Sequence, residues 1–316
     1  MTKPFIVSAD GMDPALFDRL CSNENLDVHS EKKISQDKLK ELLPKINGLV
    51  IRSATTVNKE LIDQAPNLKY VIRAGEGTDN IDKSYALEKG ISVSNTPGAN
   101  NNSATEHAIA LMMTVLRKTA HAHNTMTNGG WDKNKFVGNE LSNKTIGIIG
   151  FGRIGQIVAK RLAGFEPRIK FFDPSVETSE ISYCEKTTDL NQLFSTCDII
   201  TIHTPLNDKT KGLVGDQLLK LMKPEAILIN AARGGIVDEE ALIDVLKNKK
   251  IKGAGFDVYA QEPLPESSSL RLLENFVMTP HLGASTEEAQ FRVGEMVIYQ
   301  LDQFFNHNNL LNEVRA

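Results

Sequence analysis

Three polar side chains that could act on an alcohol or a carbonyl stand in the second half of the chain: Arg233, Glu262 and His281. Each follows a short apolar run, at 226–230, 253–256 and 276–278 respectively. A histidine suits the role of general base, because its ordinary pKa lies near neutrality. A carboxylate beside it would hold the ring and stabilise its cation, and a guanidinium would bind a substrate carboxylate through two hydrogen bonds. Together these residue types suit the oxidation of a hydroxy acid or the reverse reduction.

Taken singly, each residue also fits an ordinary structural role. His281 follows a proline and could be a capping or surface residue, Arg233 precedes two glycines and could bind a carbonyl, and Glu262 precedes a proline and could be a surface acid. However, three successive predicted strands bring these residues to one edge of a sheet, the same edge as the glycine-rich turn described below, and jointly this favours the functional interpretation. His107, early in a segment rich in Ala, Leu and Met, is predicted to be a core or interface residue.

A glycine-rich turn separates an apolar run at 145–149 from a helical pattern. Gly150 would let the chain turn, Gly152 would leave room for a pyrophosphate, and Gly155 would let helix and strand pack closely. The N terminus of the following helix would offer unpaired N–H groups and a partial positive charge to the phosphates. The order of strand, turn and helix therefore predicts a dinucleotide site.

A second apolar run, at 169–172, ends in Asp173, 18 residues after Gly155. This is close to the ~20 residues expected for an acid that binds the adenosine ribose. A carboxylate there would repel a 2′-phosphate, so the sequence favours NAD over NADP. The alternative is a plain turn residue before Pro174.

Strand and helix patterns alternate along the whole chain, which predicts parallel, doubly wound sheets. We predict an α/β protein with two such domains: a smaller flavodoxin-like substrate domain, discontinuous, from residues 1–98 and 286–316, and a larger Rossmann domain from residues 99–285. A long helix is predicted from Ser103 to about His123, followed by a loop from Trp131 to Asn143. The strands are predicted at 5–8, 26–29, 48–51, 70–72 and 91–93, and at 145–149, 169–172, 199–203, 226–230, 253–256 and 276–278.

The composition is that of an ordinary globular protein. The chain has 316 residues, of which 41% are hydrophobic and 24% charged, with a net charge of −4. No basic cluster suggests a nucleic acid, no apolar stretch suggests a membrane, and three scattered cysteines show no metal-ligand spacing. We therefore expect a cytoplasmic protein with no metal, no nucleic-acid partner and no membrane partner.

Several longer motifs carry a resemblance to a known family. The chain resembles the NAD-dependent D-isomer-specific 2-hydroxyacid dehydrogenases, and among them most closely the D-3-phosphoglycerate dehydrogenases. The resemblance runs nearly from end to end. The motifs typical of the whole family lie at Gly147–Gly155, His203–Leu206, Asn230–Asp238, Gly255–Pro263 and Thr279–Thr286; those typical of the phosphoglycerate enzymes lie at Arg52–Thr55, Asn95–Asn100 and Trp131–Leu141.

The resemblance implies roles for individual positions. Arg233, Glu262 and His281 match the family's catalytic arginine, glutamate and histidine. The positions that match its NAD contacts are Gly150, Gly152, Arg153, Ile154, Gly155, Asp173, Thr204, Pro205, Ala231, Ala232, Arg233, Asp257, His281, Gly283 and Ala284. The positions that match its substrate pocket are Arg52, Ser53, Gly75, Gly77, Asn100 and Lys133. The family forms dimers or larger oligomers, here expected through the Ser103–His123 helix and the Trp131 loop.

Three departures from the family pattern bear on the substrate and its control. The sequence ends at Ala316, so we expect no serine-binding regulatory domain, and Lys133 stands where relatives often carry arginine. Lysine keeps the charge but lacks the planar fork. Glu76 stands where relatives have a small or apolar residue, and its carboxylate would repel a phosphate if it faced the pocket.

The resemblance implies hydride transfer from C2 of a D-2-hydroxy acid to NAD, with 3-phosphoglycerate oxidised to 3-phosphohydroxypyruvate in the first step of serine biosynthesis. One alternative is a hydroxypyruvate or glyoxylate reductase, or another D-2-hydroxyacid dehydrogenase. A remoter alternative is a binding protein that senses NAD, like the corepressors among the relatives.

Overall fold

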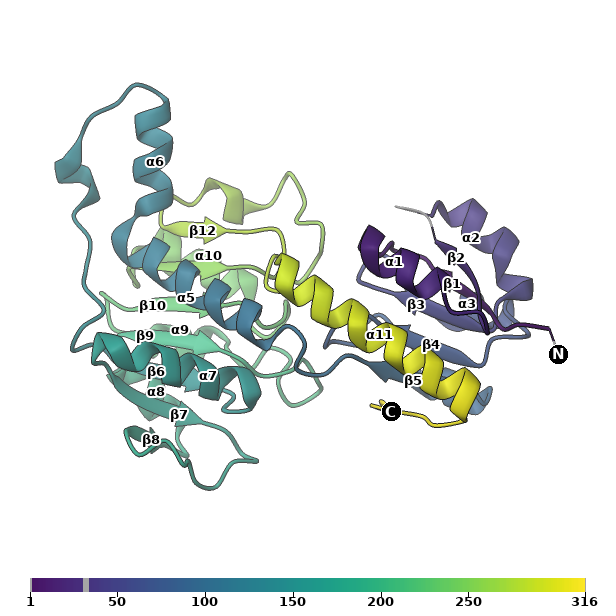
Figure 1. The fold of residues 1–316 in the computed structure, drawn as a ribbon. Coiled ribbons are helices and arrows are strands. Elements are labelled where there is room, and N and C mark those ends of the chain that lie inside the picture. Colours follow the sequence, from purple (N-terminus) through teal and green to yellow (C-terminus); the bar gives the residue numbers. More distant parts are fainter. Residues whose placement is uncertain (1, 31–33, 316) are drawn as a thin grey trace. The chain divides into compact units, whose positions relative to one another are not determined.

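The computed structural model describes residues 2–30 and 34–315 and divides into two compact units. Unit 1 comprises residues 1–100 and 284–316, and unit 2 comprises residues 101–283. Both are built from a parallel sheet flanked by helices (Figure 1). The predicted α/β class with two doubly wound domains is therefore confirmed.

Unit 1 contains a five-stranded parallel sheet in the order β2-β1-β3-β4-β5, the order of flavodoxin-like folds. Its strands are β1 (Phe5–Ser8), β2 (Asp27–Ser30), β3 (Gly48–Ile51), β4 (Tyr70–Arg73) and β5 (Ser92–Asn95). Its helices are α1 (Pro14–Cys21), α2 (Gln36–Leu42), α3 (Lys59–Asp63), α4 (Lys83–Glu88) and α11 (Glu287–His307). The late helix α11 belongs to this early sheet because Val297 and Leu301 pack against Ile6 and Tyr70.

Unit 2 contains a seven-stranded parallel sheet in the order β12-β11-β10-β9-β6-β7-β8. This is the Rossmann order with one strand added beyond the sixth. The strands are β6 (Thr145–Ile149), β7 (Arg168–Phe172), β8 (Cys184–Lys186), β9 (Ile199–Ile202), β10 (Ile227–Asn230), β11 (Gly253–Phe256) and β12 (Phe276–Met278). The sequence predicted six of them and missed β8, a three-residue edge strand with no apolar run.

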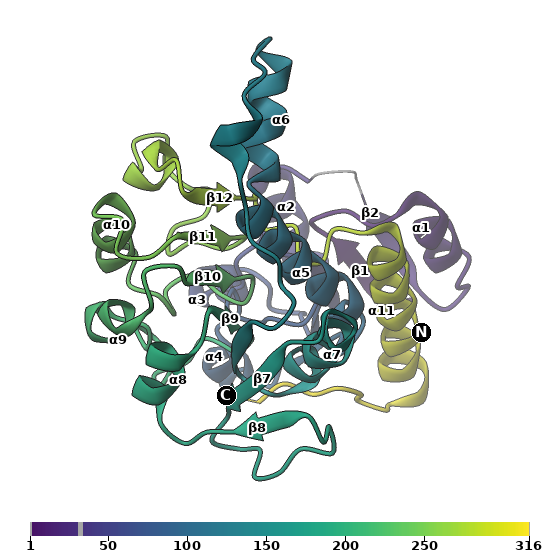
Figure 2. The ribbon, with the colours of Figure 1, turned by 90° about the vertical axis from the view of Figure 1, so that its left-hand side faces the viewer.

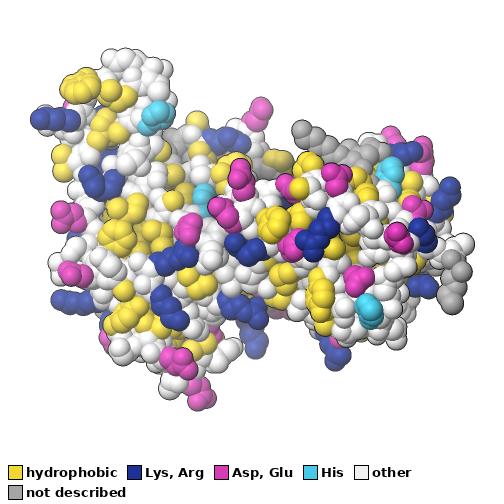
Figure 3. All heavy atoms as spheres, viewed as in Figure 1, with side chains coloured by type: hydrophobic (Ala, Val, Ile, Leu, Met, Phe, Trp, Pro, Cys, Tyr) yellow, Lys and Arg dark blue, Asp and Glu magenta, His cyan; other side chains and the backbone are white. Residues whose placement is uncertain are grey.

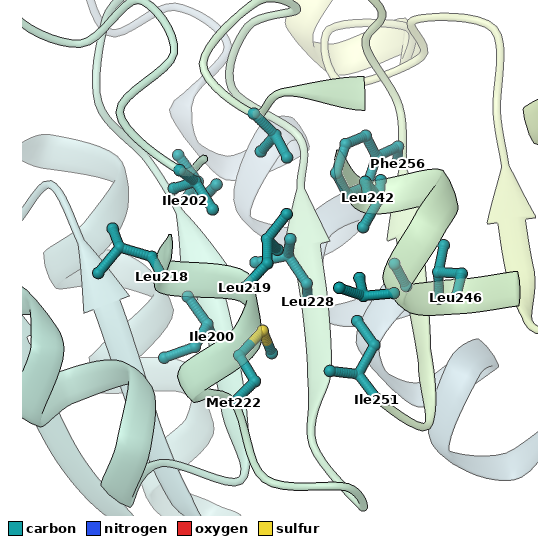
Figure 4. Close-up of a cluster of buried hydrophobic side chains, with 14 of the residues drawn as sticks. Ile200, Ile202, Leu218, Leu219, Met222, Leu228, Leu242, Leu246, Ile251 and Phe256 are labelled. Carbon is teal, nitrogen blue, oxygen red and sulfur yellow. The ribbon is translucent and has the colours of Figure 1, made fainter. Parts of the chain in front are cut away.

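The sheet of unit 2 is buried on both faces. One face packs against α5 (Asn101–Arg117) and α7 (Arg153–Leu162). The other is covered by α8 (Leu190–Thr196), α9 (Asp216–Leu221) and α10 (Glu239–Lys247), which bury Leu219, Leu242 and Leu246 against β9 and β10 (Figure 4). These central strands are buried at every position, so the loops at their carboxyl ends start from a rigid base.

The predicted helix from Ser103 to His123 is wrong as a single element. Lys118 adopts a left-handed conformation with φ of 53°, which ends α5 and starts α6 (Thr119–Thr127) in a new direction. Helix α6 buries none of its residues and projects from the sheet of unit 2 (Figures 1 and 2). The predicted loop after it contains a short 3-10 helix, η2 (Lys133–Phe136). We refer to residues 119–137 as the projecting segment.

Candidate active site

The glycine turn follows β6 directly, and its three glycines have different surroundings. Gly150 has φ of 88°, and a Cβ there would lie 2.6 Å from the carbonyl carbon of His203. A Cβ at Gly155 would lie 2.2 Å from the Gly150 carbonyl oxygen, so strand and helix meet through this glycine. A Cβ at Gly152 would have no neighbour within 4 Å. The open side of the turn is therefore the one at which a pyrophosphate could approach the backbone.

Helix α7 starts at this open side. Gly152 is its N-cap residue, and no side chain in the described part of the chain caps the helix there. An anion could accept hydrogen bonds at this end of the helix, where the helix dipole favours negative charge. Arg153 and Ile154, both predicted NAD contacts, are the first two residues of α7. Room beside Gly152 and an uncapped helix are what a bound dinucleotide requires.

Asp173 lies just beyond β7 and faces the turn. Its Oδ2 accepts a hydrogen bond of 2.7 Å from the backbone N–H of Phe151, and its Oδ1 accepts one of 2.8 Å from the N–H of Ser175. Each carboxylate oxygen can accept a further bond. Asp173 thus braces the glycine turn and keeps acceptor capacity for ribose hydroxyls.

His281 and Glu262 form a close pair. The Nδ1 atom of His281 lies 2.6 Å from Oε2 of Glu262, and the two side chains are 39% and 34% exposed. Burial raises the pKa of the Glu262 carboxyl, but hydrogen bonds from His281 and from the Tyr259 backbone N–H outweigh it, so its pKa lies below the ordinary value. Because Nδ1 faces the carboxylate, Nε2 is the ring nitrogen left for a substrate hydroxyl.

Arg233 stands on a turn that the buried Asn230 side chain holds in place. Asn230 donates from Nδ2 to the Arg233 carbonyl oxygen at 3.0 Å and accepts at Oδ1 from the Ala232 N–H at 3.1 Å. The next residue, Gly234, packs directly on the neighbouring loop, because a Cβ there would lie 1.8 Å from the Tyr259 carbonyl oxygen. The turn of Arg233 and the loop of Glu262 are therefore in direct backbone contact.

Tyr259 joins the Glu262 loop to the His281 loop. Its single hydroxyl hydrogen is shared between the carbonyl oxygens of Phe256 and Thr279, at 3.1 and 3.0 Å, and its backbone N–H donates to Oε1 of Glu262 at 3.0 Å. Burial raises the pKa of the Tyr259 phenol, which keeps the hydroxyl protonated as a donor. The loops after β10, β11 and β12 are thus tied together, and they carry Arg233, Glu262 and His281.

Asp257, predicted to contact NAD, is 1% exposed on its side chain. It accepts hydrogen bonds from the Thr279 hydroxyl at 2.6 Å and from the backbone N–H groups of Leu282 and Gly283 at 2.7 and 2.8 Å. Burial raises the pKa of its carboxyl, but these bonds and one with His107 outweigh that effect and lower it. Its oxygens hold the His281 loop, and a contact with NAD stays a prediction.

The other predicted NAD contacts of unit 2 also follow strand ends or lie in these loops. Thr204 and Pro205 come after β9, Ala231 and Ala232 come after β10, and Gly283 follows His281. Ala284, also predicted, is the first residue of the second segment of unit 1.

His203 precedes Thr204 in the loop after β9. Burial lowers the pKa of His203 to about 4, and its Nε2 lies 2.9 Å from the Thr201 hydroxyl. His203 is therefore neutral at ordinary pH.

In unit 1, the predicted substrate residues follow β3 and β4. Arg52 and Ser53 lie in the loop that follows β3. The backbone N–H of Arg52 donates a hydrogen bond of 2.6 Å to the Asp10 side chain, and the carbonyl oxygen of Arg52 accepts one of 2.8 Å from the Asn80 side chain. Sequence reasoning missed Asp10 and Asn80, which lie far from this loop along the chain. They fix the backbone that presents Arg52.

Gly75 and Gly77 flank Glu76 after β4, and Asn100 ends the first segment of unit 1. Oε2 of Glu76 accepts a 2.7 Å hydrogen bond from the Gly98 N–H, and the Glu76 carbonyl oxygen accepts one of 2.6 Å from Asn95. Glu76 therefore joins its loop to the segment that leads to Asn100. This contact gives the carboxylate a structural role that the sequence did not suggest.

Lys133, the remaining predicted substrate residue, lies in η2 on the projecting segment of unit 2, away from the carboxyl ends of the strands (Figure 1). The structure therefore does not bring Lys133 into the group formed by Arg233, Glu262 and His281.

Among residues 2–30 and 34–315, no group of three or more His, Cys, Asp or Glu side chains could hold a metal ion. A search of the same residues finds no helix long and apolar enough to span a membrane.

Comparisons with known proteins agree with this architecture. Residues 109–283, more than half of the chain, match the family model described as "D-isomer specific 2-hydroxyacid dehydrogenase, NAD binding domain". The chain is similar to a D-3-phosphoglycerate dehydrogenase of Archaeoglobus fulgidus, with 43% identity over 86% of this chain and 52% of that protein. It is also similar to a hydroxypyruvate reductase of Thermotoga maritima, with 42% identity over 90% of this chain and 93% of that protein.

A solved structure of an NAD-dependent formate dehydrogenase from Staphylococcus aureus, in complex with NAD, superposes with a TM-score of 0.89 at 31% identity, covering 99% of both chains. The present chain spans about half the length of the phosphoglycerate dehydrogenases it matches. The family model and the extent of these matches show that this chain belongs to the D-isomer-specific 2-hydroxyacid dehydrogenase family and carries its NAD-binding domain.

Proposed function

We propose that the protein is an NAD-dependent dehydrogenase that acts at C2 of a D-2-hydroxy acid. The observation that carries this proposal is the His281–Glu262 pair at 2.6 Å, on loops tied to the turn of Arg233. A histidine held by a carboxylate is the arrangement that acid–base chemistry on a hydroxyl needs. The guanidinium of Arg233 would bind the substrate carboxylate and polarise the neighbouring carbonyl in the reverse reaction.

In this mechanism each side chain has one task. NAD, when bound, would supply the hydride acceptor. The Nε2 atom of His281 takes the proton of the C2 hydroxyl, and the carboxylate of Glu262 stabilises the imidazolium through Nδ1. Arg233 orients the substrate so that C2 faces the cofactor. Because the pKa of Glu262 is lowered, this carboxylate remains charged whenever the histidine accepts a proton.

The cofactor would lie along the carboxyl edge of the sheet in unit 2. The open backbone at Gly152 and the uncapped N terminus of α7 would hold the pyrophosphate, and Asp173 would accept hydrogen bonds from the ribose. A carboxylate at this position disfavours a 2′-phosphate, which supports NAD as the cofactor.

We propose 3-phosphoglycerate as the substrate, with 3-phosphohydroxypyruvate as the product. This proposal rests on the 43% identity with a D-3-phosphoglycerate dehydrogenase and on Arg52, whose loop is held by Asp10. The hydrogen bond from the Gly98 N–H to Oε2 of Glu76 supports it further, because it stabilises a negative charge that would otherwise repel a substrate phosphate more strongly. Serine biosynthesis would be the pathway.

A second candidate is a hydroxypyruvate or glyoxylate reductase. The observation in its favour is the match to a hydroxypyruvate reductase that the chain covers over 93% of its length. Glu76 also adds a negative charge to a loop that carries predicted substrate contacts, and such a charge would weaken phosphate binding. The cofactor and the roles of Arg233, Glu262 and His281 would be the same.

We also propose the domain roles and an oligomeric state. Residues 1–98 and 286–316 would form the substrate domain, and residues 99–285 the cofactor domain. The projecting segment exposes Trp131 at 83%, Val137 at 71% and Met126 at 51%, and Figure 3 shows apolar side chains gathered over it. Exposed apolar groups of this size suit an interface, so a homodimer formed through this segment is proposed.

The test is an initial-rate assay of NADH formation with 3-phosphoglycerate, beside NADH oxidation with hydroxypyruvate and glyoxylate. The variant His281→Ala should lower kcat by ~10² or more, the range of general acid–base catalysis, with NAD affinity nearly unchanged. The matched control is His307→Ala, an exposed histidine at the end of α11. Near-normal turnover of His281→Ala would remove His281 from the mechanism, and activity with the unphosphorylated acids alone would favour the second candidate.

A further inference from the structure

His107, on α5, reaches the group of side chains beneath the His281 loop. Its Nε2 atom lies 3.1 Å from Oδ1 of Asp257 and 3.0 Å from the hydroxyl oxygen of Thr279. The side chain of His107 is 19% exposed and that of Asp257 is 1% exposed. A histidine in this place is joined to a buried carboxylate, a more specific contact than the core or interface position that the sequence predicted.

The directions of these hydrogen bonds follow from the chemistry of the groups. The Thr279 hydroxyl lies 2.6 Å from Oδ1 of Asp257 and must donate to it, because an ionised carboxylate only accepts. The hydroxyl oxygen therefore has lone pairs free to accept from His107. The Nε2 atom of His107 then carries a hydrogen that is shared between Asp257 and Thr279. His107 is thus the donor that completes this group.

The same carboxylate holds the loop that carries His281. The N–H groups of Leu282 and Gly283 donate to Asp257, and the N–H of His281 donates to the Asp257 carbonyl oxygen at 2.8 Å. His281 itself has φ of 56°, a conformation that residues with a side chain rarely adopt. Such a conformation persists only where its surroundings impose it. Asp257 and its donors are those surroundings.

Helix α5 is a rigid support for His107. Leu111 and Met112, one turn further along, are 3% and 0% exposed in the core of unit 2. At the start of the helix, Asn102 accepts a hydrogen bond of 2.9 Å from Arg161 at the end of α7, and Glu106 pairs with the same arginine. The helix that carries His107 is therefore fixed to the sheet and to the helix that follows the glycine turn.

We propose that His107 is a positioning residue for His281, acting through Asp257 and Thr279 to hold the His281 loop in its left-handed turn. The inference rests on the proposed function, because it assigns His107 a part in presenting the catalytic base. His107 does not touch the reacting atoms. It donates to the buried carboxylate that also accepts hydrogen bonds from two backbone N–H groups, of Leu282 and Gly283, and from the Thr279 hydroxyl.

The experiment compares pairs of variants that differ only in the hydrogen bond. His107→Phe keeps a planar ring without the donor, whereas His107→Gln restores an N–H at a similar reach. Thr279→Val removes the hydroxyl at constant shape, and Thr279→Ser keeps it. His107→Phe and Thr279→Val should lower kcat about tenfold or more, as expected for a displaced catalytic group. His107→Gln and Thr279→Ser should recover most of the loss.

Two further measurements separate the possible explanations. The melting temperature reports whether a variant is merely unfolded, and the ring ¹⁵N signals of His281 report the position of the loop without any turnover. Unchanged kcat and unchanged His281 signals in His107→Phe would overturn the inference, as would equal losses in His107→Gln and His107→Phe. An inactive wild type whose His281 signals still move in His107→Phe, and return in His107→Gln, would overturn the proposed function and keep the positioning role.

Discussion

The closest backbone approach near the proposed catalytic residues lies at Gly234, and it allows a sharp test. In Gly234→Ala the added Cβ would lie 1.8 Å from the Tyr259 carbonyl oxygen and 2.1 Å from its carbonyl carbon. Non-bonded carbon and oxygen atoms approach to about 3.3 Å at closest in ordinary contacts. The two loops must therefore move apart by about 1.5 Å. Both partners are backbone atoms, so no side-chain rotation can relieve the contact.

This displacement acts on Arg233 and Glu262 together, because the two loops carry these residues on either side of the contact. A misplacement of about 1 Å can cost a catalytic site ~10² in rate. We therefore expect kcat/KM of Gly234→Ala to fall by ~10² or more. Overpacking typically costs about 1–3 kcal/mol, which for a unit of this size lowers the melting temperature by roughly 2–12 °C. The protein should remain folded at 25 °C.

The assay is initial-rate kinetics beside thermal unfolding followed by fluorescence. Gly164→Ala is the matched control, because a Cβ there would meet no atom within 4 Å. It should keep the wild-type rate and melting temperature. Wild-type kcat/KM in Gly234→Ala would refute the reasoning, since it would mean that the contact between the two loops does not set the position of Arg233 and Glu262.

Three other outcomes are expected. Asp173→Ala should weaken NAD and raise the ratio of kcat/KM for NADP to that for NAD; an unchanged ratio would refute the ribose assignment. The lowered pKa of Asp257 stabilises the folded state above the ordinary carboxyl pKa of about 4, and this contribution is lost as the pH falls below it. The melting temperature of the wild type should therefore fall when the pH is lowered below about 4. Asp257→Asn should be less stable than the wild type at pH 7, and its melting temperature should change less in acid; an equal pH dependence of the two proteins would argue against this explanation. Trp131→Ala should shift the protein towards the monomer in sedimentation at micromolar concentration, and an unchanged distribution would move the proposed interface elsewhere.

The strands that carry the site were predictable because they are buried on both faces and therefore read as unbroken apolar runs. Residues 227–230 and 253–256 are buried at every position, and the loops that follow them carry Arg233 and Glu262. Chain order then placed both loops at one edge of the sheet. The edge strand β8 was not predicted, because its three residues are polar or half exposed and form no apolar run.

The supporting contacts were not predictable from spacing. His107, Asp257 and Thr279 belong to an early helix and two late loops, and only the folded chain brings them together. The break at Lys118 carries no glycine or proline signal, so a continuous helix was the natural expectation. The partner of Glu76 is a backbone N–H at Gly98, which a sequence pattern cannot show.

The two edges of the seven-stranded sheet have a consequence for aggregation. Both outer strands, β8 and β12, are only three residues long, and Glu185 on β8 pairs with Lys170 on β7 at 3.7 Å. Short edge strands, of which β8 is also charged, offer an incoming strand few hydrogen bonds, so the native sheet is a poor template for fibril growth. The central strands β9 and β10 are the opposite, since they are buried, mostly apolar and β-prone. Chains whose outer strands have not yet joined are therefore the species that would associate during refolding.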